Sequence, residues 1–234
     1  MYTPASFNVL SDIPINGKSR FLRIEPTSLS VTLKEIFESL MDISWLEQFR
    51  GTPLYGSFLA RVNPTLETIE SDFQNGSITA VDSDAGEKVV SELARQAVVF
   101  HLGYLDIPLS ELFKEQKGQN PGFDFLSMNN NQVLLFGEAK YQSGEYAYRA
   151  SHDQIKGFIE KNKDTKDIAN FVYFIPYETN HQPYANYENG VKGYMAAFSA
   201  KTKTDQELID NIQALDSFVF LQQFEEVICI AVNV

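Results

Sequence analysis

Two apolar runs at residues 122–128 and 132–141, separated by three consecutive asparagines, restrict the fold more than any other part of the sequence. Asparagine tolerates the positive φ angles of tight turns, so we expect the runs to pair as a β-hairpin. The second run changes abruptly from apolar residues to Glu138 and Lys140. Side chains at positions i and i+2 of a strand share a face, so this carboxylate and this ammonium lie side by side, next to Leu134 and Phe136.

The first run contributes a second carboxylate, because Asp124 lies between two phenylalanines near its start. Pairing of the two strands can bring Asp124 near Glu138, although the sequence does not fix the register. Two neighbouring carboxylates can hold Mg²⁺ or Mn²⁺, which activates water for attack on a phosphodiester, and a lysine beside them can orient that water. The alternatives are a salt bridge between Glu138 and Lys140 on an edge strand, and a turn or cap role for Asp124.

The elements around this hairpin alternate between helix and strand. Apolar spacing predicts helices at residues 86–102 and 151–163, and a buried strand at 171–177. The central order is therefore helix, strand, strand, helix, strand, which is typical of an α/β fold. N-terminal to these elements we predict a strand at 20–24, a helix from 30 to 49 closed by Pro53 and Gly56, and turns across 61–84 with short strands such as 77–81. C-terminal to them we predict helix across 193–215 and strands at 217–221 and 226–232.

Asp124 followed by Glu138-Ala139-Lys140 on the next strand resembles the PD-(D/E)xK nuclease superfamily. The resemblance implies a restriction-endonuclease-like α-β-β-α-β core with a mixed central sheet, elaborated at its N- and C-terminal ends. It implies that Asp124, Glu138 and the backbone carbonyl of Ala139 hold Mg²⁺ or Mn²⁺, and that Lys140 handles the nucleophile. Phe123 stands where the motif has its proline. We expect residues 1–84 to form an N-terminal elaboration packed on a nuclease-like core at 85–234.

Two further residues enter through the same resemblance. Some members place an additional glutamate on the helix before the hairpin, for which Glu92 is the candidate and Glu87 the reserve. Some use a glutamine on the helix after the motif, where Gln154 lies. The alternative for Glu92 is a solvated helix face paired with Arg95 or Lys88, and for Gln154 an ordinary polar helix position.

The segment from residue 87 to residue 141 is similar to the HamA family, the nuclease subunits of bacterial Hachiman anti-phage systems. The similarity rests on the glutamate-bearing helix and on the motifs at residues 122–125 and 135–141. It implies a heterocomplex with a superfamily 2 helicase (HamB-like) and a DNA-cutting output during infection. Residues 16–19 imitate the end of a phosphate-binding P-loop, but Asp12 replaces the required glycine, so a bend before a strand is expected and a motor must come from a partner.

The charge of the chain bears on how it meets DNA. Its 19 basic and 31 acidic residues give a formal net charge of −12, whereas DNA-binding proteins usually neutralise phosphates with a basic surface. Either basic residues cluster locally, or the acidic surface binds something else, or a partner supplies most of the affinity for nucleic acid. The competing functions are a stand-alone restriction-type endonuclease and a catalytically inactive acidic interaction protein with a nuclease-like fold.

Other classes are disfavoured by what the sequence lacks. The single cysteine, Cys229, can form neither an internal disulfide nor a cysteine zinc site, and the three histidines are scattered. The apolar runs are too short to span a membrane, and the N-terminus does not read as a secretory signal. We therefore expect a cytoplasmic protein without a membrane association.

Overall fold

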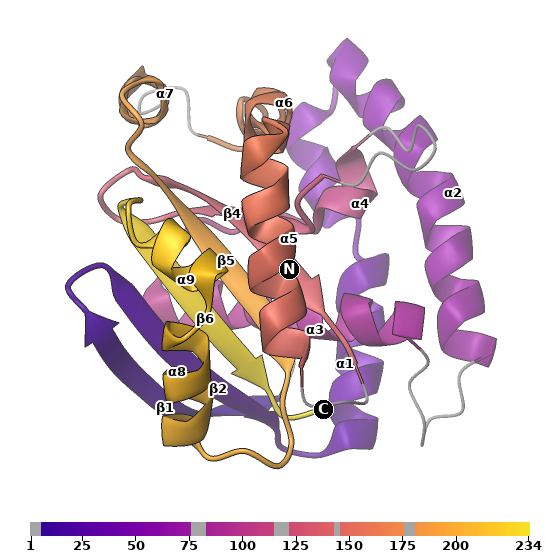
Figure 1. Cartoon of the computed structure of the whole chain (residues 1–234). Coiled ribbons are helices and arrows are strands. Elements are labelled where there is room, and N and C mark those ends of the chain that lie inside the picture. The colour runs from indigo at the N-terminus through magenta and orange to yellow at the C-terminus, as the bar shows by residue number, and fades with distance from the viewer. Residues whose placement is uncertain (1–5, 76–82, 115–121, 143–145, 176–180) are drawn as a thin grey trace.

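The computed structural model describes residues 6–75, 83–114, 122–142, 146–175 and 181–234, and within these residues a six-stranded sheet has the order β1-β2-β6-β5-β4-β3 (Figure 1). The strands are β1 (Phe7–Asn16), β2 (Ser19–Pro26), β3 (Phe125–Met128), β4 (Leu134–Lys140), β5 (Lys192–Ser199) and β6 (Glu226–Val232). Strands β2, β6, β5 and β4 are parallel, whereas β1 and β3 pair antiparallel at the two edges. The sheet is therefore mixed, with its carboxyl ends near the C-terminus in Figure 1.

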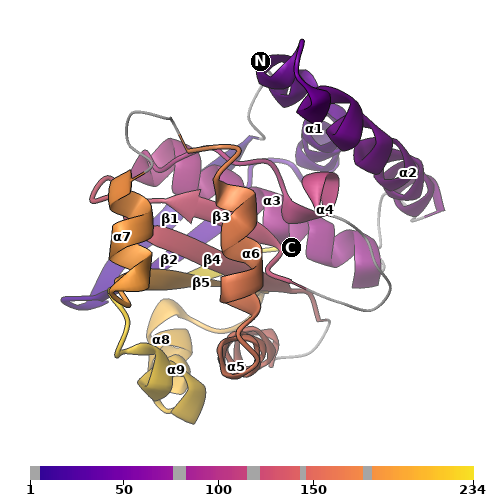
Figure 2. The same cartoon turned by 90° about the horizontal axis from the view of Figure 1, so that it is seen from above.

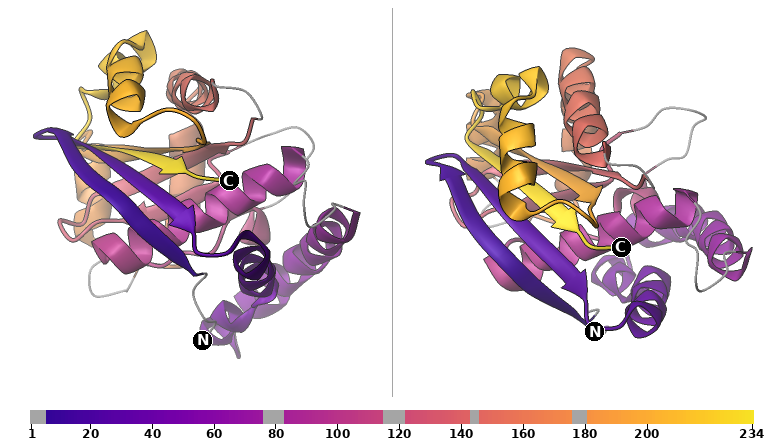
Figure 3. Two further views of the ribbon diagram at one scale, coloured as in Figure 1. Left: turned by 90° about the horizontal axis from the view of Figure 1, so that it is seen from below. Right: turned by 60° about the horizontal axis from the view of Figure 1, so that its bottom comes forward.

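Helices cover both faces of the sheet. They are α1 (Leu29–Met41), η1 (Ser44–Phe49), α2 (Pro53–Asn75), α3 (Ser83–Leu102), α4 (Ser110–Phe113), α5 (Ala147–Glu160), α6 (Lys163–Phe171), α7 (His181–Glu188), α8 (Asp205–Gln213) and α9 (Asp216–Leu221). Helix α3 packs on one face with α1 and α2 outside it, and α5 packs on the other face beside α9 (Figures 2 and 3). No helix in the described ranges has the length and apolar character needed to cross a bilayer.

The two faces of the sheet bury two separate apolar clusters. Strand β4 contributes Leu134 and Phe136 to the cluster under α5, and Leu135 and Ala139 to the cluster under α3. This alternation follows from the pleat, which points successive side chains to opposite faces. Glu138, two residues beyond Phe136, therefore belongs to the α5 face.

The prediction of an α/β protein with a mixed sheet is confirmed, and so is the hairpin of β3 and β4. The helix at 86–102, the helix beginning near 151 and the strands at 20–24 and 226–232 are found as α3, α5, β2 and β6. In the hairpin turn, the Asn129 side chain accepts hydrogen bonds from the backbone N–H groups of Asn131 and Val133, both at 2.9 Å. The positive φ falls on Gln132, at 59°, and not on an asparagine.

The prediction of turns and short strands across residues 61–84 is wrong up to residue 75. Helix α2 continues from Pro53 through Pro64, and Gly56 lies inside it, so neither Pro53 nor Gly56 closes a helix. Proline removes one helical hydrogen bond, but Pro64 is exposed while Phe58, Val62 and Ile69 are buried. Burial of this apolar face outweighs the local cost. The predicted strand at 77–81 lies outside the described residues.

Three predictions in the C-terminal half are also wrong. Residues 171–175 are the end of α6 and a turn, not a strand, and residues 176–177 lie outside the described part. Residues 193–199 belong to β5, whereas the helix predicted there begins only at α8. Strand β5 is buried on both faces, so it lacks the alternation that identifies half-buried strands. The run at 217–221 is helix α9, because short apolar runs do not distinguish helix from strand by periodicity.

The N-terminal part contributes directly to the sheet. Strand β1 is not among the predicted elements, and Pro14 within it obscures its alternating pattern. The turn at Gly17 and Lys18 joins it to β2, so the expected bend at residues 16–19 is confirmed. The division into residues 1–84 and 85–234 stays a prediction.

Candidate active site

Asp124 and Glu138 meet at the end of the β3–β4 hairpin. The backbone N–H of Asp124 donates to the Gly137 carbonyl, and its carboxylate Oδ2 accepts from the Ala139 N–H, both at 2.8 Å. Phe125 pairs with Gly137 in the ladder. This register places Asp124 across from Glu138, as the hairpin prediction requires.

Two glycines allow the surrounding elements to approach the site closely. A Cβ atom on Gly137 would overlap the ring of Phe125, so glycine lets this ring lie flat on β4. A Cβ atom on Gly86 would overlap the ring of Tyr141, so α3 can approach the end of β4 at this point. Glu87, the next residue of α3, is thereby brought to the carboxylate pair.

Lys140 lies between two acidic side chains. Its Nζ is 3.1 Å from Glu138 Oε1 and 3.2 Å from Glu87 Oε1. The Glu138 side chain is 1% exposed, the Lys140 side chain 15% and the Glu87 side chain 42%. Solvent exposure therefore increases across the site, from the buried Glu138 carboxylate through the Lys140 ammonium to the Glu87 carboxylate, which contacts solvent.

Burial dominates the electrostatics of the carboxylate pair. It raises the pKa of Asp124 to about 6, although the Ala139 N–H and the charge of Lys140 act in the opposite direction. Burial and the neighbouring charge of Asp124 raise the pKa of Glu138 well above its usual value. Burial lowers the pKa of Lys140, but the charges of Glu138, Asp124 and Glu87 outweigh this and raise it overall. The site thus holds more negative charge than its own cation neutralises.

The pair fits a bound divalent cation. Glu138 Oε2 is fully buried and makes no hydrogen bond within the described residues. Buried carboxylate oxygens normally bind a hydrogen-bond donor or a cation, so a bound cation would supply the partner that this oxygen lacks there. In those same ranges no group of three or more His, Cys, Asp and Glu side chains is arranged to hold a metal ion. Mg²⁺ does not need such a group, since it is usually bound through one or two carboxylates and keeps several waters.

A second ion pair, between Lys114 and Asp167, binds the backbone just before Asp124. Lys114 donates to Asp167 Oδ2 and to the Phe123 carbonyl, each at 2.7 Å, and the Phe123 N–H donates to Asp167 Oδ2 at 2.8 Å. Burial lowers the pKa of Lys114, with Asp167 opposing. These contacts fix both the N–H and the carbonyl of Phe123, the residue before Asp124. No sequence motif indicates them, since they join segments that only the tertiary structure brings together.

Glu111 is a further acid that sequence reasoning does not identify. Burial raises its pKa to about 7; Lys88 lowers it, and the charges of Asp124, Asp72 and Glu92 raise it further. It lies in the first turn of the short helix α4, and no sequence motif includes it.

The additional residues suggested by the resemblance do not all join the pair. Glu92 is buried in a separate network, in which it accepts from Arg95 at 2.7 Å and from Ser39 at 2.6 Å. Its pairing with Arg95 was one predicted alternative, but its face is buried and not solvated. The reserve residue Glu87, and not Glu92, is the glutamate of α3 that contacts Lys140. Gln154 is half-buried on α5, and none of the contacts within the described ranges joins it to the site.

The edge-strand alternative for Glu138 and Lys140 is excluded by the topology, because β4 lies between β5 and β3 and is an interior strand. The two residues do form a salt bridge, but within a buried site. Ala139 takes part through its N–H to Asp124, whereas a metal-binding role of its carbonyl stays a prediction.

Comparisons of this chain with protein-family models, with curated proteins and with solved structures gave no match.

Proposed function

We propose that this chain is a metal-dependent DNA nuclease of the PD-(D/E)xK type, which hydrolyses phosphodiester bonds. The observation that carries the proposal is the pair of half-buried Asp124 and buried Glu138, with one Glu138 carboxylate oxygen that has no partner in the described residues, directly beside Lys140. Its sequential context supports it, because α3, β3, β4, α5 and β5 follow one another in the order of a restriction-endonuclease-like core, with α4, α6 and α7 interposed.

Asp124 and Glu138 would hold Mg²⁺ or Mn²⁺, with the Ala139 carbonyl as a third ligand. When bound, the metal supplies Lewis-acid activation of a water and charge neutralisation at the phosphate. Lys140 stays protonated at neutral pH because its pKa is raised, so it acts as a hydrogen-bond donor and a positive charge, not as a base. It orients the attacking water and offsets charge on the phosphate. Glu87 holds its ammonium from the solvent side.

The formal charge of −12 supports a subunit that works in an assembly. We propose a cytoplasmic heterocomplex with a superfamily 2 helicase, as in Hachiman anti-phage defence. The helicase would contribute most of the DNA affinity and the motor, and this chain the cut. The same charge favours a second candidate, an inactive acidic interaction protein that retains a nuclease-like fold. The buried carboxylates oppose it, since such a pair destabilises the fold unless a cation compensates it.

The test is plasmid cleavage by the chain with its helicase partner, Mg²⁺ and ATP. We expect Glu138→Ala and Lys140→Ala each to lower the cleavage rate at least about 100-fold. Glu160→Gln, which neutralises an exposed acid at the end of α5, is the matched control and should cut like the wild type. Equal rates for wild type and both site variants would eliminate the proposed site. Absence of Mg²⁺-dependent cleavage by the wild-type complex would favour the inactive interaction protein.

A further inference from the structure

Both backbone groups of Asp124 and one of its carboxylate oxygens are held by the protein. The N–H donates to the Gly137 carbonyl, and the carbonyl accepts from the Ser110 N–H, both at 2.8 Å. Oδ2 accepts from the Ala139 N–H at 2.8 Å, whereas Oδ1 accepts no hydrogen bond within the described residues. The structure thus leaves one oxygen of Asp124, together with Oε2 of Glu138, to bind a cation.

The residue before Asp124 is held by the Lys114–Asp167 ion pair. Lys114 binds the Phe123 carbonyl, and Asp167 binds the Phe123 N–H. The Phe123 side chain is buried, and its ring packs on the Phe136 ring with the centroids 5.3 Å apart. Phe123 is therefore fixed through its backbone and its side chain, so the position of the next residue is fixed as well.

Gly122 allows the ion pair to approach the backbone this closely. A Cβ atom on Gly122 would lie 2.6 Å from Asp167 Oδ2 and 2.8 Å from Lys114 Nζ. Only a residue without a side chain leaves room there for both charged groups. An added methyl group would push the pair away from Phe123 without changing any charge, which makes this position a probe of the contact.

Helix α4 connects the ion pair with Asp124 itself. Ser110, its first residue, donates from its N–H to the Asp124 carbonyl. Lys114, which directly follows its last residue, donates from its side chain to the Phe123 carbonyl. One helical turn thus binds two successive carbonyls, and Asp167 anchors the same turn to α6.

The charge of Lys114 works against a cation at this site. Burial raises the pKa of Asp124, and the charge of Lys114 acts in the opposite direction, so this ammonium lies within electrostatic reach of the carboxylate. A positive charge at that position repels a divalent cation. If charge alone mattered, loss of Lys114 would tighten cation binding. If Lys114 acts by holding the backbone, its loss weakens binding, so the two effects differ in sign.

We propose that Lys114 and Asp167 are positioning residues for the divalent cation, which hold the backbone before Asp124 so that its free oxygen stays opposite Glu138. The inference rests on the proposed function, because the cation is the one that the nuclease site would bind. Groups that fix the orientation of metal ligands typically change metal affinity about 10- to 100-fold when they are replaced. Cation affinity therefore depends on α6, a helix that supplies no ligand.

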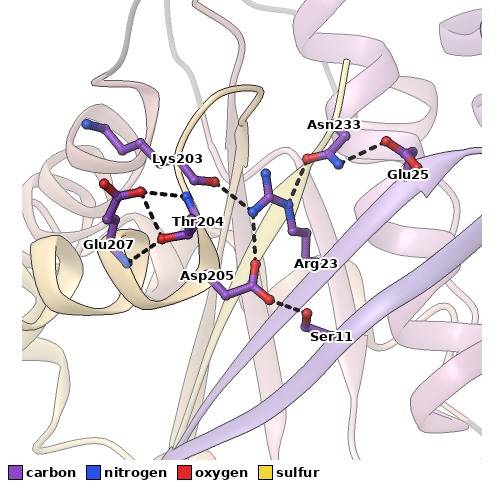
Figure 4. A network of polar contacts seen from close by, with 8 residues as sticks. All are labelled: Ser11, Arg23, Glu25, Lys203, Thr204, Asp205, Glu207 and Asn233. Atoms are coloured by element: carbon purple, nitrogen blue, oxygen red, sulfur yellow. Dashed lines mark hydrogen bonds and ion pairs between the residues drawn. The ribbon is translucent and has the colours of Figure 1, made fainter.

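A loss of stability would not by itself establish this role, because the fold uses a similar contact elsewhere. Arg23 of β2 donates to the Lys203 carbonyl at 2.8 Å and to Asp205 at 2.9 Å, and so holds the loop before α8 (Figure 4). Strand β2 is separated from β4 by β6 and β5. A cation that bridges a carboxylate and a carbonyl can thus be purely structural, so the test must measure metal binding.

The Lys192–Asp164 pair provides a matched control. Asp164 lies one turn before Asp167 on α6. The side chains of Lys192 and Asp164 are 17% and 2% exposed, close to the 16% and 8% of Lys114 and Asp167. Lys192 pairs with Leu134, at the end of β4 remote from the carboxylates. Lys192→Met therefore makes the same change in a similar environment away from the site.

The test measures Mn²⁺ binding by the full chain, from the loss of the electron paramagnetic resonance signal of free Mn²⁺. The wild type is compared with Lys114→Met, Gly122→Ala and the control Lys192→Met. A chain of net charge −12 has other acids that bind Mn²⁺, so only the binding that Glu138→Ala removes is assigned to the site. Thermal melts in EDTA establish which variants are folded, and Gly122→Ala decides the question if Lys114→Met is not.

Lys114→Met and Gly122→Ala should each raise the Kd for Mn²⁺ about 10-fold or more. Both methionine variants should lower the Tm, because each leaves a buried aspartate without its cation, but Lys192→Met should bind Mn²⁺ like the wild type. Binding as tight as wild type, or tighter, in either folded site variant would overturn the positioning role. Lys114-dependent Mn²⁺ binding without plasmid cleavage would uphold it and contradict the nuclease, whereas no Mn²⁺ binding by the wild type would contradict both.

Discussion

Replacing Asp124 with asparagine should make this protein more stable at alkaline pH. Burial raises the pKa of Asp124 from 3.8 to about 6, so its ionised form is unfavourable in the folded state. The difference corresponds to about 3 kcal/mol at 1.36 kcal/mol per pH unit. Because the side chain is half-buried and keeps some contact with water, we expect about 1–3 kcal/mol.

The sign of the pH dependence follows from the direction of the shift. A folded-state pKa above the unfolded one means that this group favours folding below about pH 3.8, and that the contribution is lost as pH rises through about 6. The asparagine variant lacks this titration. Its advantage over wild type should therefore be complete at pH 8 and absent near pH 4.

Thermal unfolding in EDTA measures the effect. A gain of about 2 kcal/mol raises the Tm of a chain of this size by about 4–8 °C. Saturating Mg²⁺ should then raise the Tm of the wild type, by an amount equivalent to about 2.7 kcal/mol at 100 times Kd, but not that of the variant. Asp153→Asn, at an exposed position of α5, is the control and should leave the Tm unchanged. A variant less stable than wild type at pH 8 in EDTA would refute the reasoning from burial.

Three further predictions concern other parts of the molecule. Gly137→Ala should lower the free energy of unfolding in urea by about 1–3 kcal/mol, because the added methyl group overlaps the Phe125 ring. Gly157→Ala is the control: its added methyl group meets nothing within 4 Å, so it should raise the free energy of unfolding by up to about 1 kcal/mol. Similar effects of the two variants would contradict the packing argument. Burial lowers the pKa of His152 to about 4, so its neutral form stabilises the folded state fully above about pH 6.5. The free energy of unfolding should then fall by about 3 kcal/mol as the pH falls to 4. His152→Leu should abolish this loss when unfolding is measured across the same pH range. Glu92→Ala should lower the free energy of unfolding by about 3 kcal/mol, because it leaves Arg95 without its bidentate partner, but it should not slow cleavage by the folded protein. Glu87→Gln should slow plasmid cleavage with little change in Tm. The reverse pattern would mean that Glu92 is the functional glutamate.

Local patterns in the sequence were sufficient for the hairpin and its polar end. The three asparagines, the alternation around Phe136 and the spacing of Glu138 and Lys140 predicted the hairpin turn, the shared face and the neighbouring side chains. These features depend on residues close together in the chain, where the pleat and the turn leave few alternatives. Local patterns failed where burial on both faces removed alternation, as in β5, and where packing overrode a proline, as in α2.

The tertiary structure alone decided which other residues complete the site. Glu87 and Glu92 lie five positions apart on one helix and are equivalent in sequence terms. The packing of α3 against β4 at Gly86 brings Glu87 to Lys140. Glu92 is instead buried where Ser39 of α1 and Arg95 of α3 itself donate to its carboxylate. A cavity at the carboxyl ends of β4 and β5 is likewise lined by loops about sixty positions apart, which contribute Gln142 and Lys201. Such proximity depends on helix rotation and strand order, which no local pattern in one sequence determines.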